Sequence, residues 1–337
     1  MKIQYFFIVC LLISSFSTQK MAAQDAEFSQ FYAAPSYLNP AMIGFSVEPR
    51  IVVNYRHQYA SFDNAYLTFA AAYDQHFDKY NSSFGMSILA DRSGQGLYNT
   101  YALNALYAYQ LQLSQELSLK VGLQAGYFQQ GIAWDKVVFG DMIDPQTGAI
   151  STSSTENLNQ QNTIRRLDFG GGLVAYTPTF YMGASFKHIT RQNVSFTDLN
   201  DLENRLAIRS VFHVGKVFYF GKPKDPRSGP SMYASPNFLF INQGRFLQLN
   251  GGIYLGKGAL FSGFWFRHTV GNSDALIFLL GVKAGVTRIA YSYDFNLTPI
   301  GTNAGSHELS LIVDWGQTDY AKNKAKRKQS GQCPEIF

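Results

Sequence analysis

Leu117 to Phe128, with the sequence Leu-Ser-Leu-Lys-Val-Gly-Leu-Gln-Ala-Gly-Tyr-Phe, alternates apolar residues with polar or small ones along almost its whole length. Successive side chains of a β-strand point to opposite faces, so this stretch would carry an apolar face and a polar face. A strand of a transmembrane β-barrel has this pattern over about 10 residues, with the apolar face toward lipid and the other toward the lumen. The stretch therefore predicts a membrane-spanning strand.

The same alternation recurs in about fourteen segments between Arg50 and Trp315, which predicts an all-β transmembrane antiparallel barrel of about 14 strands. A soluble β-sandwich is the alternative, but 21 tyrosines and 28 phenylalanines favour the aromatic girdles of a membrane barrel. The expected strands lie near residues 50–60, 64–77, 83–93, 98–113, 116–130, 166–177, 179–190, 205–220, 230–242, 244–256, 259–270, 274–284, 286–295 and 306–315.

The lengths of the connections predict how the barrel is oriented. Long connections, such as residues 131–165 and 190–204, follow odd-numbered strands, whereas residues 113–115 and 177–178 are tight turns after even-numbered strands. Outer-membrane barrels place long loops outside the cell and short turns in the periplasm. Both ends of the mature chain would then lie in the periplasm.

The two ends of the chain carry different signals. Residues 1–23 resemble a cleaved export signal, with Lys2, an apolar stretch and a small-residue cleavage site before Gln24. Together with a barrel, this signal predicts the bacterial outer membrane.

Residues 317–337 form a basic tail that supplies most of the net charge of +5, so the charge does not indicate nucleic-acid binding. Cys333 would be the only thiol of the mature chain.

Residues 24–48 do not alternate and contain two prolines, so we expect an N-terminal segment that plugs or lines the periplasmic mouth of the barrel. The predicted organisation is an export signal (1–23), this periplasmic or plug segment (24–48), one barrel (49–316) and a basic periplasmic tail (317–337). An empty lumen of about fourteen strands would conduct ions, because side chains alone cannot fill it.

The N-terminal segment also carries a family resemblance. Residues 28–32 (Phe-Ser-Gln-Phe-Tyr), Pro35 and residues 38–44 (Leu-Asn-Pro-Ala-Met-Ile-Gly) resemble the opening signature of the PorP/SprF family. One departure is Met42, where the family commonly has an aromatic residue. Further similar stretches follow in order and extend the resemblance over the mature chain: residues 55–56, 89–96, 139–141, 183–185 with His188, 291–295 and 308–311.

The resemblance implies a non-enzymatic outer-membrane component of the type IX secretion system and gliding machinery. Such a component would contact secretion proteins of the outer membrane and periplasm. It would help to secrete, or hold at the surface, partner proteins with a C-terminal sorting signal, such as adhesins. An independent porin or small-solute channel is the alternative function.

Candidate site residues follow from the signature and from charges within the expected strands. For partner binding or plugging they are Phe28, Gln30, Tyr32, Pro35, Asn39, Pro40, Phe139 and Asp141. Charged residues at membrane depth face the interior and need partners. The expected lumen charges are Arg56, Asp168, Arg209, Asp294 and Glu308. They would form either a salt-bridge network or the selectivity lining of an open pore.

No pattern in the sequence predicts catalysis or cofactor binding. The six histidines are scattered, and neither a His-Glu-x-x-His motif, a Gly-x-Ser-x-Gly elbow nor a P-loop occurs. The stretch from Asp91 to Gly96 lacks the spaced carboxylates of a calcium loop, and we expect a turn there. We therefore predict no catalytic residue, no metal site and no cofactor.

Overall fold

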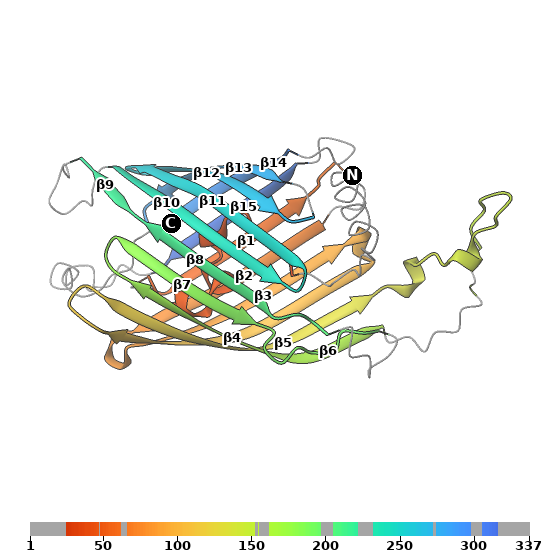
Figure 1. Cartoon of the computed structure of the whole chain (residues 1–337), viewed down its shortest axis with the longest axis horizontal. Helices are drawn as coiled ribbons and strands as arrows, with labels where there is room; N and C mark the ends of the chain where they lie inside the picture. The colour runs from red at the N-terminus through yellow and green to blue at the C-terminus, as the bar shows by residue number, and fades with distance from the viewer. Residues whose placement is uncertain are drawn as a thin grey trace, which may run out of the picture.

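The computed structural model describes residues 25–46, 48–61, 66–151, 154, 162–196, 205–221, 232–271, 274–297 and 305–315. These residues form one antiparallel sheet that closes on itself, because β1 pairs with both β2 and β15 (Figure 1). The strands are β1 (Arg50–Gln58), β2 (Tyr66–Phe77), β3 (Ser82–Ser93), β4 (Tyr98–Gln112), β5 (Ser118–Ile132), β6 (Thr163–Tyr176), β7 (Phe180–Lys187), β8 (Arg209–Lys216), β9 (Phe218–Phe220), β10 (Met232–Gln243), β11 (Phe246–Lys257), β12 (Leu260–Thr269), β13 (Ala275–Ala284), β14 (Thr287–Asn296) and β15 (Ser306–Asp314).

Strand β9 continues β8 rather than adding a wall to the barrel. Gly215 of β8 lies opposite Asn237 and Phe218 of β9 lies opposite Ala234, which is one unbroken register along β10. In this register Lys216 lies across from Pro236, directly beside the gap at Val217, and proline has no N–H to donate to the ladder. The prediction of a fourteen-stranded antiparallel barrel is confirmed, with the expected strand 205–220 divided in two.

The outer face of the barrel is apolar, as the alternation predicts. In β5, Val121 and Leu123 are exposed on the outside, while Lys120 and Gln124 on either side of them are buried inside. The same holds in the final strand, where Leu309 faces out. The apolar band around these strands is the surface that suits lipid. Among the described residues, no helix is long and apolar enough to span a bilayer.

The two ends of the barrel differ in their connections. At one end, called here the short-turn end, residues 113–117 join β4 to β5 and residues 177–179 join β6 to β7. At the opposite end, called the long-loop end, 30 residues (133–162) join β5 to β6 and 21 residues (188–208) join β7 to β8.

An arm of residues 133–151 extends from the long-loop end (Figure 1). It contains the 3-10 helices η6 (Trp134–Lys136) and η7 (Gly140–Met142), followed by a single bridge between Ile143 and Ile150. The rings of Trp134 and Phe139 stack with their centroids 6.4 Å apart and their planes at 13°.

Candidate functional site in the barrel lumen

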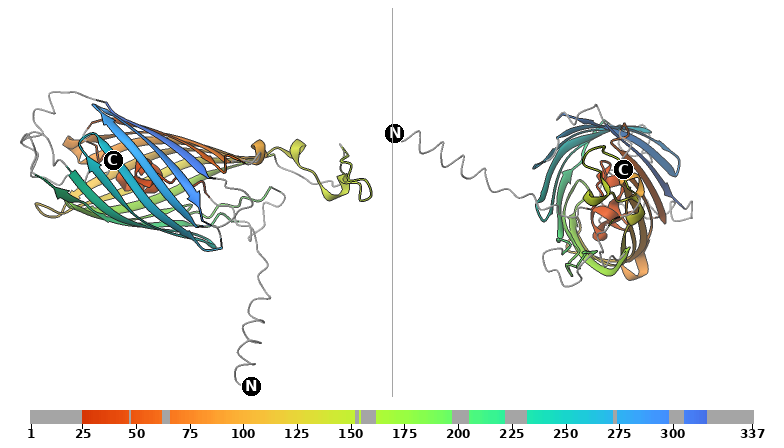
Figure 2. Two further views of the ribbon diagram at one scale, coloured as in Figure 1. Left: turned by 90° about the horizontal axis from the view of Figure 1, so that it is seen from above. Right: turned by 90° about the vertical axis from the view of Figure 1, so that its right-hand side faces the viewer.

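The N-terminal segment, residues 25–46, occupies the lumen of the barrel. In the view along the barrel it lies within the ring of strands (Figure 2). At the long-loop end, the Asp25 N–H donates to Gln243 Oε1 (3.0 Å) at the end of β10. At the short-turn end, Ser46 Oγ donates to Asp314 Oδ1 (2.9 Å) at the end of β15. We expected this segment at the mouth of the barrel, but its described residues extend from one end of the lumen to the other.

This path also places the ends of the described chain on opposite sides. Asp25 lies at the long-loop end, whereas the Trp315 N–H donates to the Pro49 carbonyl at the short-turn end. The first and last described residues therefore lie at opposite ends of the barrel, because the threaded segment crosses it once before β1 begins. The two chain ends that we expect in the periplasm lie outside the described residues.

Short helical turns fold the segment compactly enough to fit the lumen. They are η2 (Phe31–Ala33), α2 (Pro35–Leu38) and η3 (Pro40–Met42). Pro35 and Pro40 each open a turn, at a position where the missing N–H leaves no hydrogen bond unmade. The Asn39 side chain caps η3 by accepting a hydrogen bond from the Ala41 N–H (2.9 Å). The Asn-Pro-Ala stretch therefore stabilises the start of η3.

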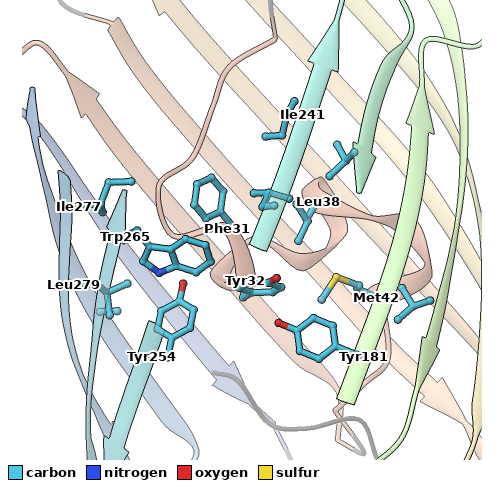
Figure 3. Packing of buried hydrophobic residues seen from close by; sticks show 14 of the residues in the cluster. Phe31, Tyr32, Leu38, Met42, Tyr181, Ile241, Tyr254, Trp265, Ile277 and Leu279 are labelled. Carbon is cyan, nitrogen blue, oxygen red and sulfur yellow. The ribbon is translucent and has the colours of Figure 1, made fainter. Parts of the chain in front are cut away.

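One half of the lumen wall is apolar and packs against this segment. Figure 3 shows Phe31 and Tyr32 directed at Trp265 and Tyr254, and the Phe31 and Trp265 rings meet edge to face at 5.2 Å. Burying a large apolar side chain stabilises a fold by about 1.5–3 kcal/mol, so this contact holds the segment firmly. The cluster includes Phe31, Tyr32, Leu38, Ala41, Met42, Val174, Tyr176, Tyr181, Val211, Leu239, Ile241, Phe246, Tyr254, Phe261, Trp265, Ile277, Leu279 and Ala290.

A buried charge cluster holds the segment against β1, β12, β14 and β15. Arg56 contacts Asp294 (2.8 Å) and Glu308 (3.0 Å), and Arg267 also contacts Asp294 (3.0 Å). Glu308 in turn accepts the backbone N–H of Ser29 (2.6 Å) and of Gln30 (3.0 Å). Two cations and two carboxylates balance, so the cluster is neutral while it fixes the backbone of the segment.

A second charge cluster fastens the first described residues to β6, β7 and β8. His188 lies between Asp25 (2.8 Å) and Asp168 (3.0 Å), and Arg209 contacts Glu27 (2.9 Å). Burial by itself would lower the pKa of His188, but the two adjacent carboxylates raise the pKa to about 9. Burial would raise the pKa of Asp25, yet His188, Arg209 and Lys187 hold that pKa well below its usual range. Both Asp25 and His188 are therefore charged at neutral pH, and their contact is an ion pair.

The C-terminal end of the segment, at the short-turn end of the barrel, is held by β2 and β5. The Gly44 N–H donates to Asp74 Oδ1 (2.6 Å), and the same carboxylate pairs with Arg50 (3.0 Å). The ammonium of Lys120 donates to the carbonyl oxygens of Ile43 (2.5 Å) and Gly44 (3.1 Å). A buried lysine without an acceptor would be costly, so these carbonyls and the lysine stabilise each other.

Glycines in the wall allow the segment to approach closely. A Cβ at Gly122 would lie 2.3 Å from the Ala41 nitrogen and 2.4 Å from the Pro40 carbonyl carbon. We predict that Gly122→Val pushes η3 away and lowers the free energy of unfolding by about 1–3 kcal/mol. The denaturant midpoint of the purified barrel, followed by its heat-dependent shift on a gel, measures this loss.

The matched control is Gly251→Val in β11, because a Cβ there would meet no atom within 4 Å. For this control, the free energy of unfolding is expected to change by less than about 0.5 kcal/mol. An equal loss in both variants would contradict the prediction, since it would mean that any side chain at a strand glycine destabilises the barrel.

The structure gathers most of the predicted site residues around the segment. Phe28 packs edge to face on Tyr37 (5.2 Å), and the Gln30 amide donates to the Glu308 carbonyl (3.0 Å). All five expected lumen charges are buried and face inward. Phe139 and Asp141 lie apart from them, on the arm. The Asp141 carboxylate accepts the Ser154 hydroxyl (2.8 Å).

The apolar half of this site was not predicted from the sequence. The lumen faces of the strands were expected to be polar, but Ile277 and Leu279 of β13 face inward while Leu276, Phe278 and Leu280 alternate with them. A strand that is apolar on both faces is covered on both faces. This pattern in residues 275–280 could have indicated that something apolar lies in the lumen.

A small cavity lies beside the segment. A cavity of about 60 Å³ lies between the segment and the wall formed by β3 to β7, lined by Tyr37, Asp91, Gln124, Gln130 and Lys187 among others. Such a volume accommodates about four to six water molecules. Within the described residues, no group of three or more His, Cys, Asp or Glu side chains could hold a metal ion. The arrangement can thus obstruct the lumen, and it offers no metal centre there.

The chain matches one protein family in sequence and is similar to solved barrel structures. A sequence model described as "Type IX secretion system membrane protein PorP/SprF" matches residues 20–313. The chain is similar to the solved outer membrane protein Omp33 of Acinetobacter baumannii (10% identity, 80% of this chain and 99% of that chain, TM-score 0.42). It is also similar to a mutant of the TodX monoaromatic hydrocarbon channel (10% identity, 84% and 94%, TM-score 0.45). Among curated proteins no match was found.

Proposed function

The chain belongs to the PorP/SprF family of type IX secretion system membrane proteins, and from this premise we propose that it is a non-enzymatic subunit of that machinery in the outer membrane. It helps to secrete surface proteins or to anchor them, by protein–protein contacts. Its clients are proteins with a C-terminal sorting signal, such as the adhesins of gliding cells. The family match over residues 20–313 is the observation that carries this proposal.

The filled lumen favours this function over the alternative of an independent porin. A porin needs a water-filled path, whereas here Phe31, Tyr32 and the charged network around Arg56 occupy the interior. A barrel that is closed by its own chain still offers its two ends for binding. Contact at the ends is what a secretion subunit requires.

The two ends of the barrel suit two groups of partners. With the long loops outside, the β5–β6 arm reaches away from the membrane toward a secreted protein. The short turns and the basic tail (317–337) then face the periplasmic components, and lipid surrounds the apolar band. The export signal (1–23) and this tail lie outside the described residues, and both remain part of the proposal.

Affinity purification of the tagged protein from outer membranes in mild detergent, followed by mass spectrometry, tests the function. We expect secretion-system subunits or a large surface protein to copurify. Recovery of the barrel alone, from cells that make normal amounts of those subunits, would overturn the proposal and favour the porin.

The arm allows a sharper test of the partner contact. Phe139→Ala together with Asp141→Asn removes the ring that stacks on Trp134 and the carboxylate that holds Ser154. If the arm presents the binding residues, copurification of the external partner should fall roughly 10-fold or more, as for loss of a binding hot spot. Quantitative mass spectrometry of the same purification provides the measurement.

Tyr80→Ala is the control for the arm variant, because Tyr80 is an exposed aromatic residue (61%) at the short-turn end. Unchanged recovery of the external partner is expected with this control. Equal recovery with the arm variant and the control would show that the arm does not bind the partner.

A further inference from the structure

The direction in which the N-terminal segment crosses the lumen is set by a consistent series of contacts. Asp25 contacts His188, which directly follows β7, and Gln243 at the end of β10. Both positions belong to the long-loop end. Asn39, farther along the segment, donates to the Leu173 and Ala184 carbonyls within β6 and β7 (3.2 and 3.1 Å). Asn39 therefore lies closer to the short-turn end than Asp25 does.

The last part of the segment arrives at the opposite end. Gly44 contacts Asp74 toward the end of β2, and Lys120 at the start of β5 binds the neighbouring carbonyls. Ser46 then reaches Asp314, the last residue of β15. Between these ends the segment is folded, since the Tyr37 hydroxyl donates back to the Ala26 carbonyl. Its first described residue nevertheless lies at the long loops and its last at the short turns.

We infer that the segment is threaded from the outside of the cell inward, so that Asp25, its first described residue, lies among the external loops. The inference uses the orientation on which the proposed function also rests, with long loops outside. It changes the role of the N-terminal end, which then cannot dock on periplasmic components. Instead, it belongs to the surface that an extracellular protein partner can reach.

Contacts with the barrel wall fix the position of Asp25 at the long-loop end. Ion pairs with His188 and Arg209 hold Asp25 and Glu27 at the rim. The β7–β8 connection lies alongside, because Leu206 lines the same cavity as Asp25. A partner that binds this connection would therefore touch the N-terminal end as well, and the two form one external interaction surface.

Epitope insertion at three positions tests the threading. The same short epitope is inserted between Gln24 and Asp25, between Thr147 and Gly148 of the arm, and between Gln115 and Glu116 of a short turn. Antibody binding to intact cells is compared with binding to permeabilised cells. We expect the first two epitopes to be labelled on intact cells, and the third only after permeabilisation, with at least a tenfold difference.

The three epitopes distinguish the direction of the segment within the lumen from the orientation of the barrel in the membrane. An N-terminal epitope that behaves like the turn epitope, while the arm epitope is labelled on intact cells, overturns the inference and leaves the proposed orientation standing. An arm epitope that needs permeabilisation while the turn epitope does not overturns the orientation itself, and with it the external surface.

A second measurement avoids any disturbance of threading by the inserted epitope. Single cysteines replace Ala26 and Ser46, both half-buried, in a chain with Cys333→Ser, and a small membrane-impermeant thiol reagent is added to intact cells. Ala26→Cys should react at least tenfold faster than Ser46→Cys. Equal rates, or the reverse order, would contradict inward threading.

Discussion

Deleting residues 25–46 is expected to convert a barrel that does not conduct ions into a conducting pore. The deletion removes Phe31, Tyr32 and the helical turns that fill the lumen, whereas all strands and their pairings remain. A ring of fourteen strands is too wide for its own side chains to close. Planar-bilayer recordings should show no steady conductance for the full chain and porin-like steps for the deletion variant.

The deletion also uncovers apolar wall residues such as Trp265 and Ile277, so its folding must be checked independently. The heat-dependent gel shift of the purified variant shows whether the barrel is closed. A folded deletion variant without conductance would mean that the wall closes the lumen by itself. Steady conductance of the full chain would show that the segment does not seal it.

Replacing Arg56 by methionine should be the most destabilising single substitution in the lumen. Arg56 contacts both Asp294 and Glu308. Among the described residues, its loss therefore leaves Glu308 without a paired cation and Asp294 with Arg267 alone. Removing one partner of a buried ion pair costs about 3–5 kcal/mol, because the remaining charge stays buried. The denaturant midpoint of the folded barrel in detergent should fall accordingly.

Two further variants make this prediction specific. Arg165→Met is the matched control, because Arg165 is exposed and the described residues provide no ion pair for it; a change within about 0.5 kcal/mol is expected. Combining Arg56→Met with Glu308→Gln removes the stranded charge and should restore part of the lost stability. An equal loss for Arg165→Met and Arg56→Met would contradict the role of the buried cluster.

The strands of this barrel could be predicted from the sequence because each of them is a local pattern. In β5, alternation of Leu123 with Gln124 reports directly which side faces lipid and which faces the lumen. The lumen charges could be found for a similar reason, since a carboxylate such as Asp294 within an apolar strand needs an interior partner. The resemblance of residues 28–44 indicated a special N-terminal segment, though not its position.

The number of strands, the face that each one turns to lipid, and five of the buried charges could be read from the sequence, but not the buried Asp74 and Lys120. Which charges meet, the apolar character of much of the lumen, and the path of residues 25–46 across the barrel are seen only in the folded chain. The physical reason is sequence separation. Alternation acts between neighbours, whereas Ser29 and Glu308, whose contact holds the segment, are 279 residues apart, and only closure of the barrel brings them together.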